Sequence, residues 1–176
     1  TGLSKILSQG PLSHSLEDFD AKSGRVLMSR SAQAMQRSPQ PATELVELNL
    51  ATSALTVLGQ YNTFNQAKYT DDGIYVTAGP DFNNGLGRNL PEGMLANNYD
   101  GQLYLLSRDG KKATPLSKEF NPAIGQLNVF KNGDALIKVT EQDTVQLYQF
   151  DLSKKRFNKV NTGFDVVEQV SYSHER

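Results

Sequence analysis

The chain has 176 residues, of which 38% are hydrophobic and 21% charged, a composition typical of a globular protein of one domain or slightly more. Its 18 Lys and Arg residues nearly balance 19 Asp and Glu residues, so the basic excess typical of nucleic-acid-binding proteins is missing. The sequence has no cysteine, which excludes disulfides, thiolate nucleophiles and Cys-ligated zinc. No apolar stretch reaches the ~18 residues that a membrane-spanning helix needs.

Three similar units follow one another along the chain, and each is predicted to contain four short strands separated by turns. The first unit (13–58) has predicted strands at 14–18, 25–30, 44–50 and 54–58. The second unit (64–116) has predicted strands at 65–69, 74–78, 102–107 and 112–116. The third unit (125–160) has predicted strands at 125–130, 135–140, 145–151 and 156–160.

The units are related by sequence as well as by pattern. The segments ELVELNLATSALTVL, QLYLLSRDGKKATPL and QLYQFDLSKKRFNKV align without gaps, with Leu45, Leu103 and Leu147 equivalent. An upstream hairpin in each unit turns at AKSG, TDDG or KNGD, where Gly and Asn allow two strands to reverse tightly. A repeat of four short antiparallel strands is typical of a β-propeller blade. The sequence therefore predicts an all-β protein, a β-propeller of about three blades.

Both ends of the chain are expected to belong to neighbouring blades. Residues 4–7 (SKIL) are similar to the last strand of a preceding blade, and 166–173 (VVEQVSYS) to the first strand of a following one. A propeller closes with roughly four to eight blades. We therefore expect an incomplete propeller, a fragment whose ring is completed by further blades of a parent protein or by blade exchange with a second copy.

The blade pattern resembles the propeller of the prolyl oligopeptidase family of serine peptidases, especially the acylaminoacyl-peptidase and dipeptidyl-peptidase branch. The resemblance lies in TELVELNL (43–50), DGQLYLLSRDGKKATPLS (100–117) and NPAIGQLNVFKNGDALIKVTEQDTVQLYQFDL (121–152). The chain departs from the family by lacking the proline before the turn glycine. The resemblance implies a non-catalytic cap on an α/β-hydrolase domain that restricts access to short peptides. The G-x-S-x-G motif of that domain is absent here, so no catalytic residue is carried over.

Candidate catalytic and cofactor motifs in the chain have simpler interpretations. His14 and His174 stand beside serines near inner strands, but no oxyanion hole or third group accompanies them. Glu17–Asp18 and Asp71–Asp72 are interpreted as solvent and turn residues. Residues 85–87 (GLG) lack the strand-to-helix turn of a dinucleotide site, and 81–85 (DFNNG) lacks the later glutamate of a calcium loop. We therefore expect no catalytic residue, cofactor or metal in this chain.

The segment 79–98 (GPDFNNGLGRNLPEGMLANN) is the unusual part of the sequence, an insertion between the second and third strands of the second unit. An insertion of about twenty residues is long for a compact domain and is more often functional. It should lie on the same face as the crossings between blades, where a rigid scaffold presents binding loops. The candidate interaction residues are Asp81, Asn83, Arg88, Glu92 and Asn97.

Two functions follow from the sequence. The first is the propeller portion of a serine peptidase, with the remaining blades, an α/β-hydrolase domain and peptide substrates as partners. The second is a stand-alone binding or scaffold propeller with no hydrolase attached. The lack of cysteine and of glycosylation sequons favours a bacterial protein, cytoplasmic or exported. We expect no membrane span and no nucleic-acid partner.

Overall fold

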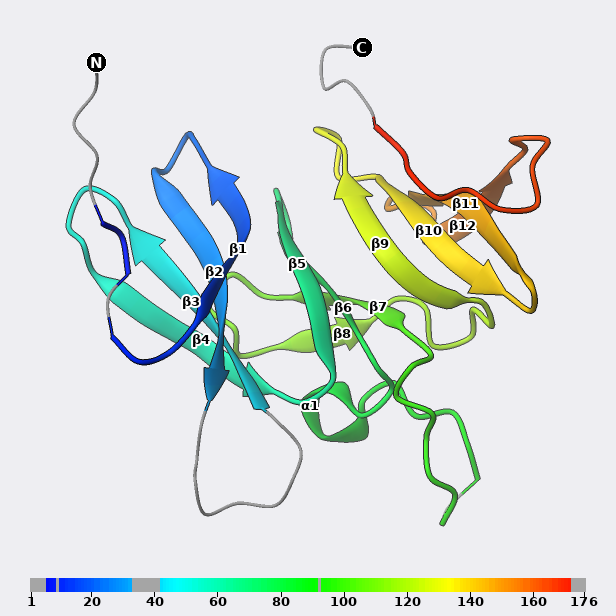
Figure 1. Cartoon of the computed structure of the whole chain (residues 1–176), viewed down its shortest axis with the longest axis horizontal. Coiled ribbons are helices and arrows are strands. Elements are labelled where there is room, and N and C mark those ends of the chain that lie inside the picture. The colour runs from blue at the N-terminus through cyan, green and yellow to red at the C-terminus, as the bar shows by residue number, and fades with distance from the viewer. Residues whose placement is uncertain (1–5, 9, 33–41, 92, 172–176) are drawn as a thin grey trace.

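The computed structural model describes residues 6–8, 10–32, 42–91, 93–171, which form three four-stranded antiparallel sheets (Figure 1). Blade one contains β1 (His14–Asp20), β2 (Arg25–Ala32), β3 (Ala42–Asn49) and β4 (Leu55–Tyr61). Blade two contains β5 (Phe64–Thr70), β6 (Gly73–Ala78), β7 (Gln102–Leu106) and β8 (Ala113–Pro115). Blade three contains β9 (Ala123–Val129), β10 (Ala135–Glu141), β11 (Thr144–Asp151) and β12 (Arg156–Val160). The predicted all-β fold is confirmed, and the three sheets fit an incomplete propeller of about three blades.

The strands of each blade pair in chain order, and short turns join several of these pairs, as between β1 and β2, β5 and β6, and β10 and β11. The β1–β2 turn shows how the sequence achieves this: Gly24 has a φ of 62°, a left-handed conformation that glycine adopts without a steric penalty. The Asp20 carboxylate accepts hydrogen bonds from the Lys22 amide (3.0 Å) and the Ser23 hydroxyl (2.8 Å) in the same turn. One short helix, α1 (Phe82–Gly85), occurs among the described residues, and none of their helices is long and apolar enough to cross a membrane.

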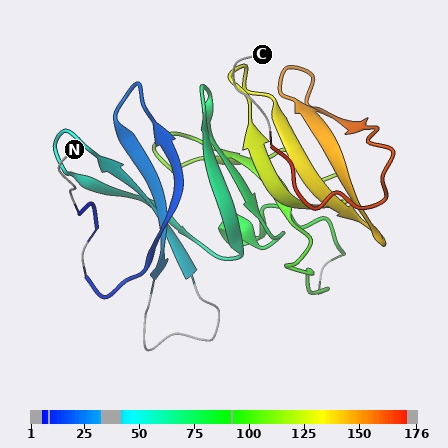
Figure 2. The same ribbon diagram turned by 45° about the horizontal axis from the view of Figure 1, so that its top comes forward.

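The blades stand side by side like the segments of a fan, with β1, β5 and β9 adjacent along its inner side (Figures 1 and 2). The first core cluster lies between blades one and two and includes Leu27, Leu45, Val76 and Tyr104. The second lies between blades two and three. Its fully buried members include Tyr75, Leu127 and Ile137. Apolar faces of neighbouring sheets therefore hold the blades together.

Hydrogen bonds between inner strands use side chains in place of a backbone ladder. The Glu17 carboxylate of β1 accepts hydrogen bonds from the Ser29 hydroxyl (2.6 Å) and from the backbone amide of Ala67 in β5 (3.1 Å). The Asp18 carboxylate accepts one from the Tyr69 amide at 2.8 Å. The interpretation of Glu17–Asp18 as solvent residues was therefore wrong, because both carboxylates join blade one to blade two.

A second link of this kind joins blades two and three. The side-chain amide of Gln66 in β5 both donates to the Leu127 carbonyl (3.2 Å) and accepts from the Leu127 amide (3.0 Å) in β9. A glutamine side chain thereby takes the place that a backbone peptide has in a continuous sheet.

Each inner strand contains a register shift of the β-bulge type at an equivalent place. The shifts lie between Leu16 and Asp18 in β1, between Phe64 and Gln66 in β5, and opposite Lys138 and Val139 in β9. A bulge places two residues of one strand opposite one residue of its partner, so consecutive side chains no longer alternate strictly between faces. This local geometry explains why Glu17 and Asp18 both reach β5.

The two end segments differ from the sequence prediction. The described part of 166–173 forms no strand: Val166 makes a single parallel bridge to Val145 at the start of β11. The segment, red in Figure 1, then continues across blade three. There the Lys138 ammonium donates to the Glu168 carbonyl at 3.1 Å. Residues 6–7 of the predicted strand 4–7 have no regular structure, and residues 4–5, 172 and 173 lie outside the described ones.

Candidate functional site

The insertion between β6 and β7 is the longest connection whose path the structure describes almost completely, and it projects beyond the end of blade two (Figure 1). It leaves the sheet on the same face as the β4–β5 crossing and the β10–β11 turn, as predicted from the strand order (Figures 1 and 2). We refer to residues 79–101 as the β6–β7 loop.

One aromatic side chain fastens this loop to the sheets. Phe82 at the start of α1 is fully buried, with its ring 4.7 Å from that of Tyr61 and 4.6 Å from that of Tyr104, measured between centroids. The Tyr104 hydroxyl donates to the Gly79 carbonyl at 3.0 Å. Burial raises the pKa of the Tyr104 hydroxyl, so this group remains a donor at neutral pH. The loop is therefore anchored in the core between blades one and two.

A charged cluster ties the two ends of the loop to each other. The Asp81 carboxylate accepts hydrogen bonds from the Arg88 guanidinium (2.5 Å) and from the Asn98 side-chain amide (3.0 Å). These bonds hold the pKa of the Asp81 carboxyl below its usual value. Gly79 permits the close approach, since a Cβ atom there would lie 2.6 Å from the Asn98 carbonyl oxygen. The base of the loop is closed by contacts made within the loop itself.

The far part of the loop exposes apolar side chains. Leu95 and Tyr99 are each 95% exposed, and Met94 is 59% exposed. The Asn97 side chain shapes the turn between them, donating to the Asp100 carboxylate (3.1 Å) and accepting from the Tyr99 amide (3.2 Å). Isolated exposed apolar residues are common on protein surfaces, but three on one projecting loop make it the candidate contact surface of this chain.

The candidate interaction residues take different places in this arrangement. Asp81 and Arg88 pair with each other at the base, and Asn97 shapes the turn beside the exposed tip. Asn83 adopts a left-handed backbone with a φ of 46°, a conformation that asparagine tolerates better than most residues. Glu92 lies outside the described residues. None of the exposed apolar residues Met94, Leu95 and Tyr99 is among the predicted interaction residues, although an apolar pair inside a Gly- and Asn-rich loop is a visible signal in the sequence.

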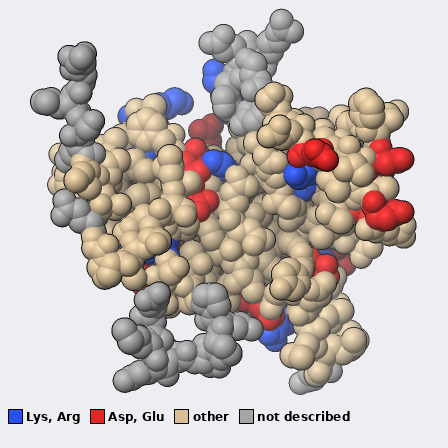
Figure 3. Space-filling model, in the orientation of Figure 1, with Lys and Arg blue, Asp and Glu red and all other residues tan. Residues whose placement is uncertain are grey.

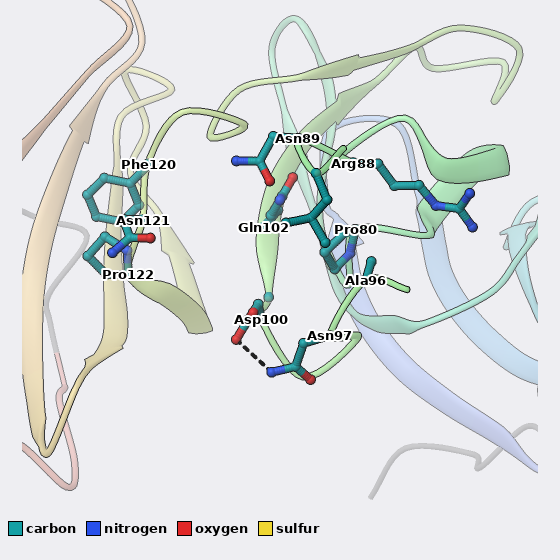
Figure 4. Close-up of a pocket in the computed structure, with 12 residues that line it drawn as sticks. Pro80, Arg88, Asn89, Ala96, Asn97, Asp100, Gln102, Phe120, Asn121 and Pro122 are labelled. Carbon is teal, nitrogen blue, oxygen red and sulfur yellow. Dashed lines mark hydrogen bonds between the residues drawn. The ribbon is translucent and has the colours of Figure 1, made fainter. Parts of the chain in front are cut away.

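A small pocket of about 80 Å³ lies beside the loop, where the crossing from blade two to blade three passes. Figure 4 shows side chains from both segments around it. Its polar lining includes Asn89, Asn97, Asp100, Gln102 and Asn121. Gln102 donates to the Gly87 carbonyl at 3.0 Å, so part of this lining also stabilises the loop. The pocket could accommodate a small polar group next to the exposed tip.

A second, open groove lies between the ends of the inner strands and is lined by charges of both signs, among them Asp20, Lys68 and Arg108. Arg108 lies 4.5 Å from the centre of the Tyr69 ring and donates to the Thr70 carbonyl at 3.1 Å. The Tyr69 hydroxyl donates to the Glu47 carboxylate at 2.8 Å, and burial and that carboxylate raise the pKa of Tyr69. The Tyr69–Glu47 hydrogen bond joins blade two to blade one, whereas both Arg108 contacts lie within blade two.

Catalytic and metal-binding chemistry gains no support from the geometry. His14 pairs with Arg30 within the β1–β2 ladder, and His174 lies outside the described residues. Both oxygens of Asp81, the first residue of the calcium-like motif, accept hydrogen bonds from Arg88 or Asn98. Within the described ranges, no group of three acidic or histidine side chains is placed to hold a metal ion.

Neither of two comparisons with known proteins identifies a relative of this chain. A scan against protein-family models finds no match, and a search of curated proteins finds no significant similarity. The fold and the β6–β7 loop are therefore the features that bear on function.

Proposed function

We propose that this chain is a non-catalytic propeller module that binds a neighbouring protein domain through the β6–β7 loop. The observation that carries the proposal is the combination of a fastened base, through Phe82 and Asp81, with the 95% exposure of Leu95 and Tyr99. A loop that is already ordered loses little conformational entropy on binding, and apolar and aromatic side chains are effective anchors.

The resemblance of the blades to prolyl oligopeptidase propellers suggests which domain this is. In that interpretation, the partner is the α/β-hydrolase domain of a serine peptidase, and the propeller restricts access to short peptides. The loop contributes a contact with the hydrolase domain, and the small pocket beside Asp100 and Asn121 lies next to that contact.

The test uses the full-length protein that contains this chain. A fluorophosphonate probe should label a serine outside residues 1–176, and calorimetry should show the propeller and the hydrolase domain unfolding together. The double variant Leu95→Ser/Tyr99→Ser should separate the two transitions and relax the selectivity for short peptides. The control Lys111→Ser/Lys154→Ser replaces exposed turn residues and should leave both properties unchanged.

The outcomes separate the two parts of the proposal. If the fluorophosphonate probe does not label the full-length protein, the proposal that the partner domain is a serine peptidase is excluded. A labelled parent whose unfolding and selectivity are unaffected by Leu95→Ser/Tyr99→Ser would exclude the loop as the contact.

The second candidate function is a stand-alone binding or scaffold propeller. The lack of a matching family model favours it, since it requires no membership of the peptidase family. It predicts that no serine in the parent reacts with the probe and that the Leu95→Ser/Tyr99→Ser variant loses binding of a separate partner protein.

A further inference from the structure

The open groove between the inner strands lies at the end of blade two that is remote from the β6–β7 loop. At the groove end of β5, Thr70 pairs with Gly73, whereas Phe64 at the other end pairs with Ala78, after which the loop begins. Three segments, one from each blade, line the groove together with a residue of the β7–β8 turn: 18–22, 68–71, 128–131 and Arg108. Its volume of about 600 Å³ lies in the range of about 300–1,000 Å³ typical of small-molecule sites.

Basic side chains outnumber acidic ones in this groove. Figure 3 shows acidic and basic atoms close together between blade one and blade two. The groove is lined by three carboxylates and four cations: Asp18, Asp20, Asp71, Lys22, Lys68, Lys131 and Arg108. The lining therefore has an excess of one positive charge.

Two of the three carboxylates are already occupied by donors of the protein. The Asp18 carboxylate accepts hydrogen bonds from the backbone amides of Phe19 (2.9 Å) and Tyr69 (2.8 Å). The Asp20 carboxylate accepts hydrogen bonds from groups of its own turn. Asp71 is exposed, and its carboxylate has no hydrogen-bond or ion-pair partner among the described residues.

Two of the cations are held in place without losing their charge. The Lys68 ammonium donates to the Glu17 carbonyl, and the Arg108 guanidinium donates to the Thr70 carbonyl at 3.1 Å. A backbone carbonyl is neutral, so these bonds position the cations but do not neutralise them. Arg108 lies 3.9 Å from the Asp20 carboxylate, a long ion pair that leaves other N–H groups of the guanidinium for a ligand.

The other two cations, Lys22 and Lys131, come from the turns after β1 and β9. In the part of the chain that the structure describes, neither ammonium group has a hydrogen-bond or ion-pair partner. Ammonium and guanidinium groups form strong charge-assisted hydrogen bonds with carboxylates. Apolar residues line the groove beside them: Phe19 is 50% exposed, and Val129 is half-buried. The groove therefore offers a ligand both cationic and apolar contacts.

We propose that this groove binds a ligand with one carboxylate attached to an apolar body. The carboxylate bonds to Lys22, Lys131 and the remaining N–H groups of Arg108, while the apolar body packs on Phe19. The excess of a single positive charge, together with the unpaired carboxylate of Asp71, favours a monoanion over a phosphate dianion. Both the C-terminal residue of a peptide and a free aryl or alkyl carboxylic acid have this chemistry.

The first test is a titration of the ¹⁵N-labelled 176-residue chain with N-acetylphenylalanine, followed by NMR. Saturable shifts of the backbone amides of 18–22, 68–71 and 128–131 are expected, with a Kd on the order of 1 mM. The matched control ligand is the neutral amide of N-acetylphenylalanine. It should bind about tenfold more weakly, because it lacks the negative charge that the cations recognise.

The second test changes the charges of the groove. Lys22→Gln/Lys131→Gln should raise the Kd for N-acetylphenylalanine about fivefold, since it removes two exposed cations. The control Lys154→Gln/Lys155→Gln removes the same charge from the β11–β12 turn, outside the groove lining, and should leave the Kd unchanged. Asp71→Asn removes a repelling carboxylate and should lower the Kd about threefold, a gain that damage to the fold would not produce. Circular dichroism of every variant verifies folding.

Two further ligands distinguish the sources of the carboxylate. Acetyl-glycyl-glycyl-phenylalanine extends the probe by a peptide chain, whereas 3-phenylpropionate lacks the acetamide group. Tighter binding of the longer peptide indicates a peptide C-terminus as the ligand. Equal or tighter binding of 3-phenylpropionate indicates a free carboxylic acid.

Any of three results would overturn the proposal: no saturable shifts in the three segments up to about 20 mM probe, equal affinity for the acid and its amide, or equal effects of the Lys22→Gln/Lys131→Gln and Lys154→Gln/Lys155→Gln variants. The groove and the β6–β7 loop share no residue, so Leu95→Ser/Tyr99→Ser should bind the probe as the unchanged chain does. Failure of the loop as a contact surface and failure of the groove as a binding site are therefore distinguishable.

Discussion

Phe82 is the residue whose removal tests most directly whether the β6–β7 loop is fastened to the blades. Its ring is fully buried and packs between Tyr61 and Tyr104. Phe82→Ala removes roughly 150 Å² of buried apolar surface, which at about 25 cal/mol per Å² corresponds to about 4 kcal/mol. This value lies in the range of 3–5 kcal/mol typical of buried Phe→Ala substitutions, and it is a large part of the usual stability of a domain, about 5–15 kcal/mol.

The assay is equilibrium unfolding in urea, followed by circular dichroism at constant protein concentration. Phe82→Ala should lower the free energy of unfolding by about 4 kcal/mol, and Phe82→Leu, which retains most of the apolar volume, by only about 1–2 kcal/mol. The control Leu95→Ala changes an exposed residue of the same loop and should stay within about 0.5 kcal/mol of the unchanged protein. A loss below about 1 kcal/mol for Phe82→Ala would refute the anchoring role of this residue.

Three further substitutions test the hydrogen bonding of the fold. Glu17→Ala leaves the Ala67 amide without its partner between blades, and should cost about 2 kcal/mol in a urea titration. Thr77→Val removes a buried hydroxyl that has no hydrogen-bond partner among the described residues, and should raise the free energy of unfolding by up to about 1 kcal/mol. Asp81 has a lowered pKa, so its stabilising contribution is present above about pH 4 and is lost as the pH falls through its folded-state pKa. The unchanged protein should therefore lose thermal stability below pH 4, whereas Asp81→Asn should not show this loss. The difference in stability between the two proteins should be under about 1 kcal/mol, because Arg88 is half exposed.

Each of these predictions has an outcome that contradicts it. An unchanged Glu17→Ala protein would mean that the carboxylate does not join the blades; Asp71→Asn, in an exposed turn, is its matched control. If Thr77→Val lowers the free energy of unfolding by more than about 0.5 kcal/mol, the Thr77 hydroxyl does not destabilise the fold as predicted. Identical acid profiles of the unchanged protein and Asp81→Asn would show that the ion pair with Arg88 contributes nothing.

Much of the fold could be predicted from the sequence because its signals are local. Turn glycines such as Gly24, together with alternating apolar residues, identify where strands end, and each of the strands predicted within the three units overlaps an observed one. The sheets are made of strands adjacent in sequence, so the pairing order required no long-range information.

The contacts between blades could not be predicted in this way. Glu17 and Asp18 are adjacent in the sequence, and strict alternation would send them to opposite faces. The bulge in β1 removes that alternation, and nothing in the local sequence indicates a bulge there. Segment 166–171 looks like a strand because it is rich in valine, which favours strands. Its backbone, however, bonds only to Val145 and to a lysine side chain in place of a full ladder.

The side-chain links between inner strands have a consequence for how the chain tolerates sequence change. A continuous backbone ladder would transmit any insertion of one residue in β5 to every strand that follows, because pairing register is shared along a sheet. Here each sheet has its own register, and neighbouring sheets contact through apolar faces and through a few flexible side chains such as those of Glu17 and Gln66. An insertion or deletion should therefore alter the pairing of one blade and leave the others in register, so that blades can vary in length one at a time.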